Sequence, residues 1–100
     1  MNENTKQAYE YGRWEAVVWD MQEINGNRKF NIPKVHKRMK DNPRFMYDAI
    51  MKRTRFDERH KRMLEDIDLS EIPKKFTSEE WGSEALGYWQ QRGKIHGLHD

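Results

Sequence analysis

The side chains with the clearest chemistry are the lysines and arginines between residues 28 and 62. This basic central unit holds 13 cations and four acids, for a net charge of +9. Residues 1–27 carry a net charge of −3 and residues 63–100 carry −4, so the overall charge of +2 hides an acidic–basic–acidic order. Cationic side chains bind phosphates and release the counterions around them. The pattern therefore favours a nucleic-acid-binding surface, with DNA as the expected partner.

The expected contacts are cations of the predicted central helices and of the segment between them. A phosphate contact fixes a protein on a nucleic acid without reading its sequence, so we expect little base recognition. The alternative interpretation is a solvated basic face, or one that pairs with the acidic ends of the chain. The predicted nucleic-acid-binding residues are Lys34, Lys37, Arg38, Lys40, Arg44, Lys52, Arg53, Arg55, Arg59 and Arg62.

The other polar residues give little support for metal binding or catalysis. His96 and His99 are three residues apart, but a glycine lies between them and no cysteine is present to complete a zinc site. His60 follows Asp57 by three residues, yet acid–base catalysis also needs a pocket and a shifted pKa. The carboxylates that follow the basic central unit match no cation-binding motif. We therefore expect no catalytic residue, no metal ion and no cofactor.

Length and composition predict one small domain over residues 1–100. The charged fraction of 36% and the hydrophobic fraction of 35% lean toward disorder, but 12 aromatic residues can supply a buried core. The absence of cysteine excludes disulfides and fits a cytoplasmic location. No apolar run reaches the roughly 20 residues of a membrane span, and the N-terminus has no apolar signal-peptide core. We expect a cytoplasmic protein with no membrane partner.

The first predicted helix covers residues 5–25, with Asn4 or Thr5 as its cap and Gly26 after its end. Steps of about 100° per residue place its apolar side chains on one arc. We expect this arc to face the core, and its members are Tyr11, Trp14, Val17, Val18, Met21 and Ile24.

A second facet of this helix carries small residues. Ala8, Gly12 and Ala16 are four residues apart, and Trp19 lies beside them, off the apolar arc. Small residues at this spacing let another helix approach closely. Packing against a later helix of the same chain is the favoured interpretation. The alternative is a partner-binding or homodimer interface in which Trp19 is the exposed anchor.

Two further helices are predicted over residues 32–40 and 43–53. The sequence Asp41-Asn42-Pro43 separates them, because proline disfavours helical geometry before it and suits the first position of a helix. Asp41 or Asn42 is the expected cap of the second helix. Their order and lengths fit a helix–turn–helix-like unit, whose second helix would enter the major groove near Arg44.

The apolar residues of this central region set its expected packing. Phe45 and Met46 should face inward from the second of these helices. A bend near Thr54 is slightly preferred over one continuous helix to residue 67, with Thr54 and Asp57 as a variant capping box that restarts a helix at residue 55.

The last predicted helix has the strongest local start signal. Thr77 and Glu80 form a capping box, and Arg92 and Gly93 close the helix. Its buried stripe should contain Trp81, Ala85, Tyr88 and Trp89. Residues 1–4 and 94–100 are expected to be flexible.

These features predict an all-α fold, a small single-domain bundle of four to five helices with a helix–turn–helix-like basic centre. The expected function is that of a non-enzymatic accessory protein that binds nucleic acid through residues 28–62. The alternative is a protein–protein module (an adaptor, inhibitor or virion component) that docks on a larger complex through the basic face and the small-residue facet. No family motif is present. Small size, absence of cysteine, tryptophan content and charge are together typical of bacteriophage accessory proteins.

Overall fold

The computed structural model describes residues 2–25 and 41–97, with the backbone alone for residues 23–25. Over these ranges it is all-helical and contains no strand, which confirms the predicted fold class. The helix predicted over residues 32–40 lies outside them, so the helix–turn–helix-like unit stays a prediction. The helices are α1 (Glu3–Asn25), α3 (Pro43–Arg53), α4 (Glu58–Glu65) and α5 (Ser78–Gly97).

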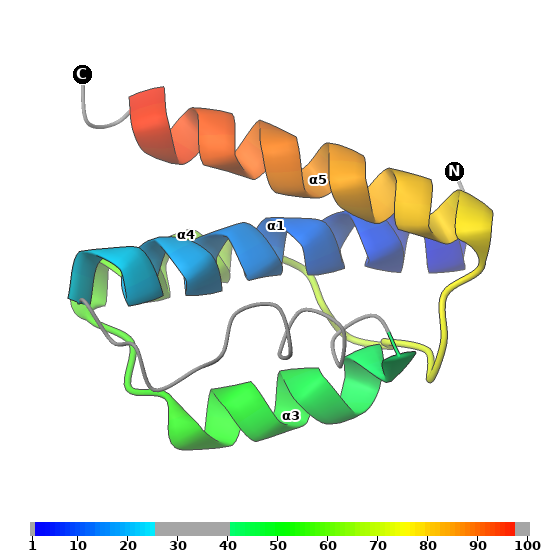
Figure 1. Cartoon of the computed structure of the whole chain (residues 1–100), viewed down its shortest axis with the longest axis horizontal. Helices are drawn as coiled ribbons and strands as arrows, with labels where there is room; N and C mark the ends of the chain where they lie inside the picture. The colour runs from blue at the N-terminus through cyan, green and yellow to red at the C-terminus, as the bar shows by residue number, and fades with distance from the viewer. Residues whose placement is uncertain (1, 26–40, 98–100) are drawn as a thin grey trace.

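The helices are arranged around α1. Figure 1 shows α5 running along one side of α1 and α3 lying on the other. α4 packs near the C-terminal end of α1. Residues 14–22 of α1 are all buried, polar side chains included. A helix that is enclosed on every side is the centre of a fold, and the other helices are positioned by what it presents to them.

Aromatic side chains attach α3 to α1. The Trp14 ring lies with its centroid 5.1 Å from that of Tyr11 and 5.0 Å from that of Tyr47 on α3. The indole Nε1 of Trp14 donates to the sulfur of Met51 at 3.3 Å. Tyr11 also contacts Phe76, which precedes α5, at 5.5 Å between ring centroids. Each buried ring removes about 150–250 Å² from water, so a few of them account for much of this small core.

Two glycines bring α1 and α5 into backbone contact. A Cβ atom at Gly12 would overlap the carbonyl oxygen of Glu84, and one at Gly87 would overlap the carbonyl oxygen of Tyr9. Nearby, Ala16 of α1 packs in a cluster with Ile95 of α5. The small-residue facet of α1 therefore packs against a later helix of the same chain, in agreement with the favoured interpretation.

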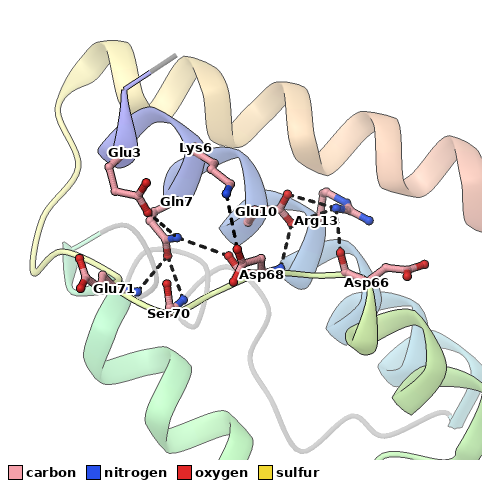
Figure 2. Close-up of polar contacts among 9 residues, drawn as sticks. All are labelled: Glu3, Lys6, Gln7, Glu10, Arg13, Asp66, Asp68, Ser70 and Glu71. Atoms are coloured by element: carbon pink, nitrogen blue, oxygen red, sulfur yellow. Dashed lines mark hydrogen bonds and ion pairs between the residues drawn. The ribbon is translucent and has the colours of Figure 1, made fainter.

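Polar side chains of α1 hold the connector between α4 and α5, as Figure 2 shows. The amide oxygen of Gln7 accepts from the backbone N–H groups of Ser70 and Glu71, both at 3.2 Å. Its amide nitrogen donates to the carbonyl oxygen of Asp68 at 3.3 Å. Nearly two turns further along α1, Arg13 donates to the carbonyl oxygen of Asp66 at 3.3 Å. A chain segment without regular structure thus finds partners for its backbone polar groups on the central helix.

Local capping signals fix two helix starts as predicted. The N–H of Thr77 donates to the Glu80 carboxylate at 2.9 Å, and the N–H of Glu80 donates to the Thr77 hydroxyl at 3.2 Å, which completes the capping box. The side chain of Asn42 caps α3, with Pro43 in its first position. Both arrangements join residues at most three positions apart, so sequence alone is sufficient to predict them.

Three other helix ends differ from the prediction. The side chain of Asn2 accepts from the N–H of Thr5 at 2.8 Å, so α1 starts at Glu3 and neither Asn4 nor Thr5 is its cap. The bend near Thr54 is confirmed, but α4 starts only after Asp57, which is its cap. α5 continues past Gly93 to Gly97, because Ile95 is buried against α1 and its packing extends the helix.

Three residues that were predicted to face the core, on two helices, are exposed instead. Phe45 of α3 and Trp89 of α5 are exposed, and so is Ala85. The buried face of α5 instead contains Glu84, Gly87 and other polar or small residues. The close approach at the glycines decides which side of α5 faces α1, and Leu86 and Trp89 end up on the opposite side. Trp81 and Tyr88 of the predicted stripe are partly buried and pack against the core, as expected.

We expect Gly87→Ala to lower the free energy of unfolding by about 3 kcal/mol or more, because the added Cβ atom meets backbone that cannot rotate away. Gly82→Ala on the same helix is the matched control. No heavy atom lies within 4 Å of a Cβ at Gly82, so this change should raise the free energy of unfolding by up to about 1 kcal/mol. Urea denaturation of dilute protein, followed by circular dichroism, measures both. Similar effects from the two variants would contradict the close contact.

Candidate nucleic-acid interface

Six of the ten predicted nucleic-acid-binding residues fall within the described ranges, and four do not. Lys52 and Arg53 lie in the last turn of α3, where positive charge is favourable beside the carbonyl end of the helix dipole. Arg55 lies in the link between α3 and α4. The predicted residues outside the described ranges are Lys34, Lys37, Arg38 and Lys40, and their contribution stays a prediction.

The end of α3, the link and the start of α4 follow one another at one end of the molecule, beside the C-terminal end of α1 (Figure 1). Five cations of the last turn of α3, the link and α4 have exposed side chains, and four of them, all except Lys61, make no ion pair with a described residue. We call this set the basic end, and its members are Lys52, Arg53, Arg55 and Arg62.

The cations of the basic end have no ion-pair partner within the described part of the chain. Among the described residues, none of the four makes a hydrogen bond or an ion pair. Two neighbouring cations differ. Lys61 pairs with Glu58 at 3.6 Å, and Arg59 is half-buried and has an interaction partner. Three of these charges lie at the end of α3 and in the link, and the fourth, Arg62, lies in the last turn of α4.

Arg44 is tied to another part of the protein. Its Nε donates to the carbonyl oxygen of Ile72 at 2.6 Å, which holds the start of α3 against the connector. A cavity of about 380 Å³ lies beside this contact, lined by Arg44, Tyr47, Asp48 and residues 69–72. A short, part-buried bond of this kind is structural, so Arg44 lies apart from the basic end.

Two carboxylates outside the basic central unit pair with cations that also lie outside it. Glu10 pairs with Arg13 on the same helix at 2.9 Å. Asp68 in the connector pairs with Lys6 at 3.5 Å. Asp20 is a described carboxylate outside the basic central unit that contacts a side chain inside it, the ring of His60.

A buried histidine fixes α4 to α1. His60 is only 1% exposed, and its Nε2 lies 2.9 Å from the Asp20 carboxylate of α1. Its Nδ1 lies 2.7 Å from the carboxylate of Asp57, the cap of α4. Both contacts are hydrogen bonds at the same time when the ring is an imidazolium ion, because both of its nitrogens then donate. The pair of contacts sets the rotation of α4, with Met63 and Leu64 packed on the core and Arg62 turned to solvent.

The pKa of Asp57 lies below its ordinary value. The main cause is the hydrogen bond that its carboxylate accepts from the backbone N–H of His60, followed by the bond from the histidine ring. The spacing of Asp57 and His60 was visible in the sequence, but nothing there indicated Asp20, which is 40 residues away along the chain.

The four predicted partner-binding residues lie inside the chain. Ala8 and Ala16 are fully buried, and Gly12 is in contact with α5. Trp19 is 7% exposed and belongs to the main core cluster, so the expectation that it is an exposed anchor is wrong. The physical reason is that α1 is enclosed on all sides, so a residue off its main apolar arc is still in the core.

No group of three or more histidine or acidic side chains within the described residues is placed to hold a metal ion. His60 is enclosed by two carboxylates and has no surface that a substrate could reach. Burial raises the pKa of the Tyr11 hydroxyl far above its ordinary value, so the phenol stays neutral. None of the described helices combines the length and apolar character that crossing a lipid bilayer requires.

Comparisons with protein-family models, with curated proteins and with solved structures find no match for this chain.

Acidification should destabilise the protein partly through Asp57. A carboxyl group whose pKa is lower in the folded state stabilises the fold above its unfolded pKa of about 3.9, and this contribution is lost as the pH falls through the folded value. We expect the free energy of unfolding to fall more steeply between about pH 5 and pH 2 for the unmodified chain than for Asp57→Asn. Thermal melts across this pH range measure the difference.

Two further variants separate charge from capping. Asp57→Ala also removes the cap of α4 and should cost about 1 kcal/mol at neutral pH, whereas asparagine keeps the cap. Asp41→Asn removes an exposed carboxylate that makes no described contact, so its pH dependence should match that of the unmodified chain. An Asp57→Asn variant as acid-sensitive as the unmodified chain would refute this role.

Proposed function

We propose that this chain is a small non-enzymatic accessory protein that binds nucleic acid through phosphate contacts. One observation carries the proposal: the basic end exposes four cations that no described carboxylate neutralises. Unpaired like charges held close together repel one another, and a polyanion that lies across them relieves this repulsion. Each phosphate bound in this way also releases counterions, which supplies a favourable entropy.

The expected mode of binding is contact with the backbone of the nucleic acid. Arg44, the cation nearest the start of α3, has its Nε bonded to Ile72 and is poorly placed to read a base edge. Phosphate contacts alone position a protein without sequence preference. The proposal therefore predicts similar affinity for DNA duplexes of different sequence.

An exposed aromatic ring adds a possible contact with unpaired bases. Phe45 lies two helical turns before Lys52 on the same face of α3, and its side chain is exposed. Aromatic rings stack on single-stranded bases with about 1–3 kcal/mol per base. Phe45→Ala should therefore weaken the binding of single strands and leave the binding of duplexes unchanged.

The alternative function is a protein–protein module that docks on a larger complex. The small-residue facet lies against α5 and Trp19 is buried in the core, so the basic face is the part of that hypothesis which remains for a partner. A pull-down from the native cell with and without nuclease separates the two functions. A partner that survives nuclease treatment favours the module, and recovery that depends on nucleic acid favours the proposal.

We expect Lys52→Glu/Arg55→Glu to weaken the binding of a mixed-sequence DNA duplex at least tenfold. Fluorescence anisotropy with labelled DNA and RNA at several salt concentrations measures this. Four phosphate contacts should give a plot of log affinity against log salt with a slope of about −4.

The matched control is Lys74→Glu/Lys75→Glu in the connector. Both of these lysines are exposed and the net charge changes by the same amount, but they lie outside the basic end. This variant should lose much less affinity. Circular dichroism and a thermal melt check that both variants are folded. Equal loss in the two variants would show a general charge effect, and binding that is insensitive to salt would refute the proposal.

A further inference from the structure

The outer face of α5 is apolar and open. Trp89 is 68% exposed and Leu86 is 52% exposed. Gly82 and Gly93 lie on the same face, and no heavy atom comes within 4 Å of a Cβ built at either of them. Steps of 100° per residue place these four residues opposite Gly87, which faces α1. The face therefore combines two large apolar side chains with two positions at which the helix backbone is bare.

Glycine at exposed positions inside a helix needs a physical reason. Each one costs the helix about 1 kcal/mol relative to alanine. On its inner face, α5 uses Gly87 to reach the backbone of Tyr9 on α1. Gly82 and Gly93 lack a side chain on the outer face in the same way, which would let a second helix approach as closely. A helix that presents bare backbone beside exposed Trp89 and Leu86 has the features of an unoccupied helix-packing surface.

The four residues of this face have the same order of intervals along the chain in either direction. Successive members are separated by four, three and four residues: Gly82, Leu86, Trp89 and Gly93. A twofold axis that passes between residues 87 and 88 would therefore place Gly82 opposite Gly93 of a second copy, and Leu86 opposite its Trp89. Self-complementarity of this kind is what a twofold-symmetric interface requires.

The charges at the two ends of α5 select the antiparallel arrangement. Its first turn carries exposed Glu79, and its last turn carries exposed Lys94 and His96. Antiparallel pairing brings the acidic first turn of one helix beside the basic last turn of the other, at both ends of the contact. Parallel pairing would place like charges and like helix ends together.

We propose that the outer face of α5 binds a second copy of this chain, with the two α5 helices antiparallel. A helix of 20 residues is about 30 Å long, so the contact is small for a protein interface. The dimer should therefore be weak and should form over roughly micromolar concentrations. This inference does not depend on nucleic-acid binding, because the basic end belongs to α3, the link and α4.

The first test compares two exposed aromatic residues. Sedimentation equilibrium of the full chain, from low micromolar to several hundred micromolar protein, should show a reversible monomer–dimer equilibrium. Trp89→Glu should weaken association at least tenfold. Phe45→Glu is the matched control, since Phe45 is 65% exposed but lies on α3, and it should leave association unchanged.

Glycine variants give a result that a folding defect cannot mimic. Gly82→Ala and Gly93→Ala should each raise the thermal stability of dilute protein, because alanine favours the helix. Both should weaken dimerisation, because the added methyl groups separate the two helices. Greater stability combined with weaker association is expected only if these glycines lie in the interface.

Charge exchange and cross-linking test the direction of the helices. Glu79→Lys and His96→Glu should each weaken the dimer, because the twofold axis places these two positions opposite each other, and the double variant should recover part of the loss. The chain has no cysteine, so single-cysteine variants are free of background reactions. When Gly82→Cys and Gly93→Cys proteins are mixed and oxidised, a disulfide should join one to the other in preference to joining like chains.

Three results would overturn the proposal. A chain that stays monomeric at several hundred micromolar has no such interface. Preferential disulfides between two Gly82→Cys chains would show a parallel pair. A dimer that resists Trp89→Glu but is disrupted by Phe45→Glu would place the interface on α3.

Discussion

The backbone contact between α1 and α5 at Gly12 and Gly87 is the constraint on which the rest of the structure depends. It encloses α1 on the side of α5, and it sets which face of α5 turns inward. Arg13 is a polar group that finds partners across this contact. It donates through Nε to the side-chain oxygen of Gln91 at 3.0 Å, and through another nitrogen to Glu10 and to the connector. Such pairing lowers the cost of placing a charged side chain in a small core.

The enclosure of α1 also explains why the basic end stays unneutralised. The polar residues of α1 make their contacts inside the fold. Gln7 and Arg13 bind the connector, and Asp20 binds His60. Asp20 is a described carboxylate of the acidic N-terminal segment that reaches the basic central unit, and there it contacts a histidine. Among the described residues, Lys52, Arg53, Arg55 and Arg62 receive no carboxylate partner. For these four cations the charge separation present in the sequence persists in the described part of the fold.

The two surfaces that we connect with binding differ in their physics. The basic end is charged and exposed, and its affinity for an anion falls as salt screens it. The outer face of α5 is apolar, and its contribution to binding comes from area removed from water and from close packing. A chain of 12.2 kDa has a modest core, so additional burial between copies also adds to the stability of the fold.

The sequence by itself determined the helical class, the caps at Asn42 and Thr77, the bend near Thr54 and the charge separation. Each of these depends on composition or on residues within a few positions of one another. The tertiary structure decided which helix faces are buried, because that depends on which segments become neighbours. Periodicity placed Trp89 in the core and Trp19 outside it, but the glycine contact turned one outward and the enclosure of α1 buried the other. The bond between Asp20 and His60 likewise joins residues 40 positions apart, and such a distance in sequence carries no local signal.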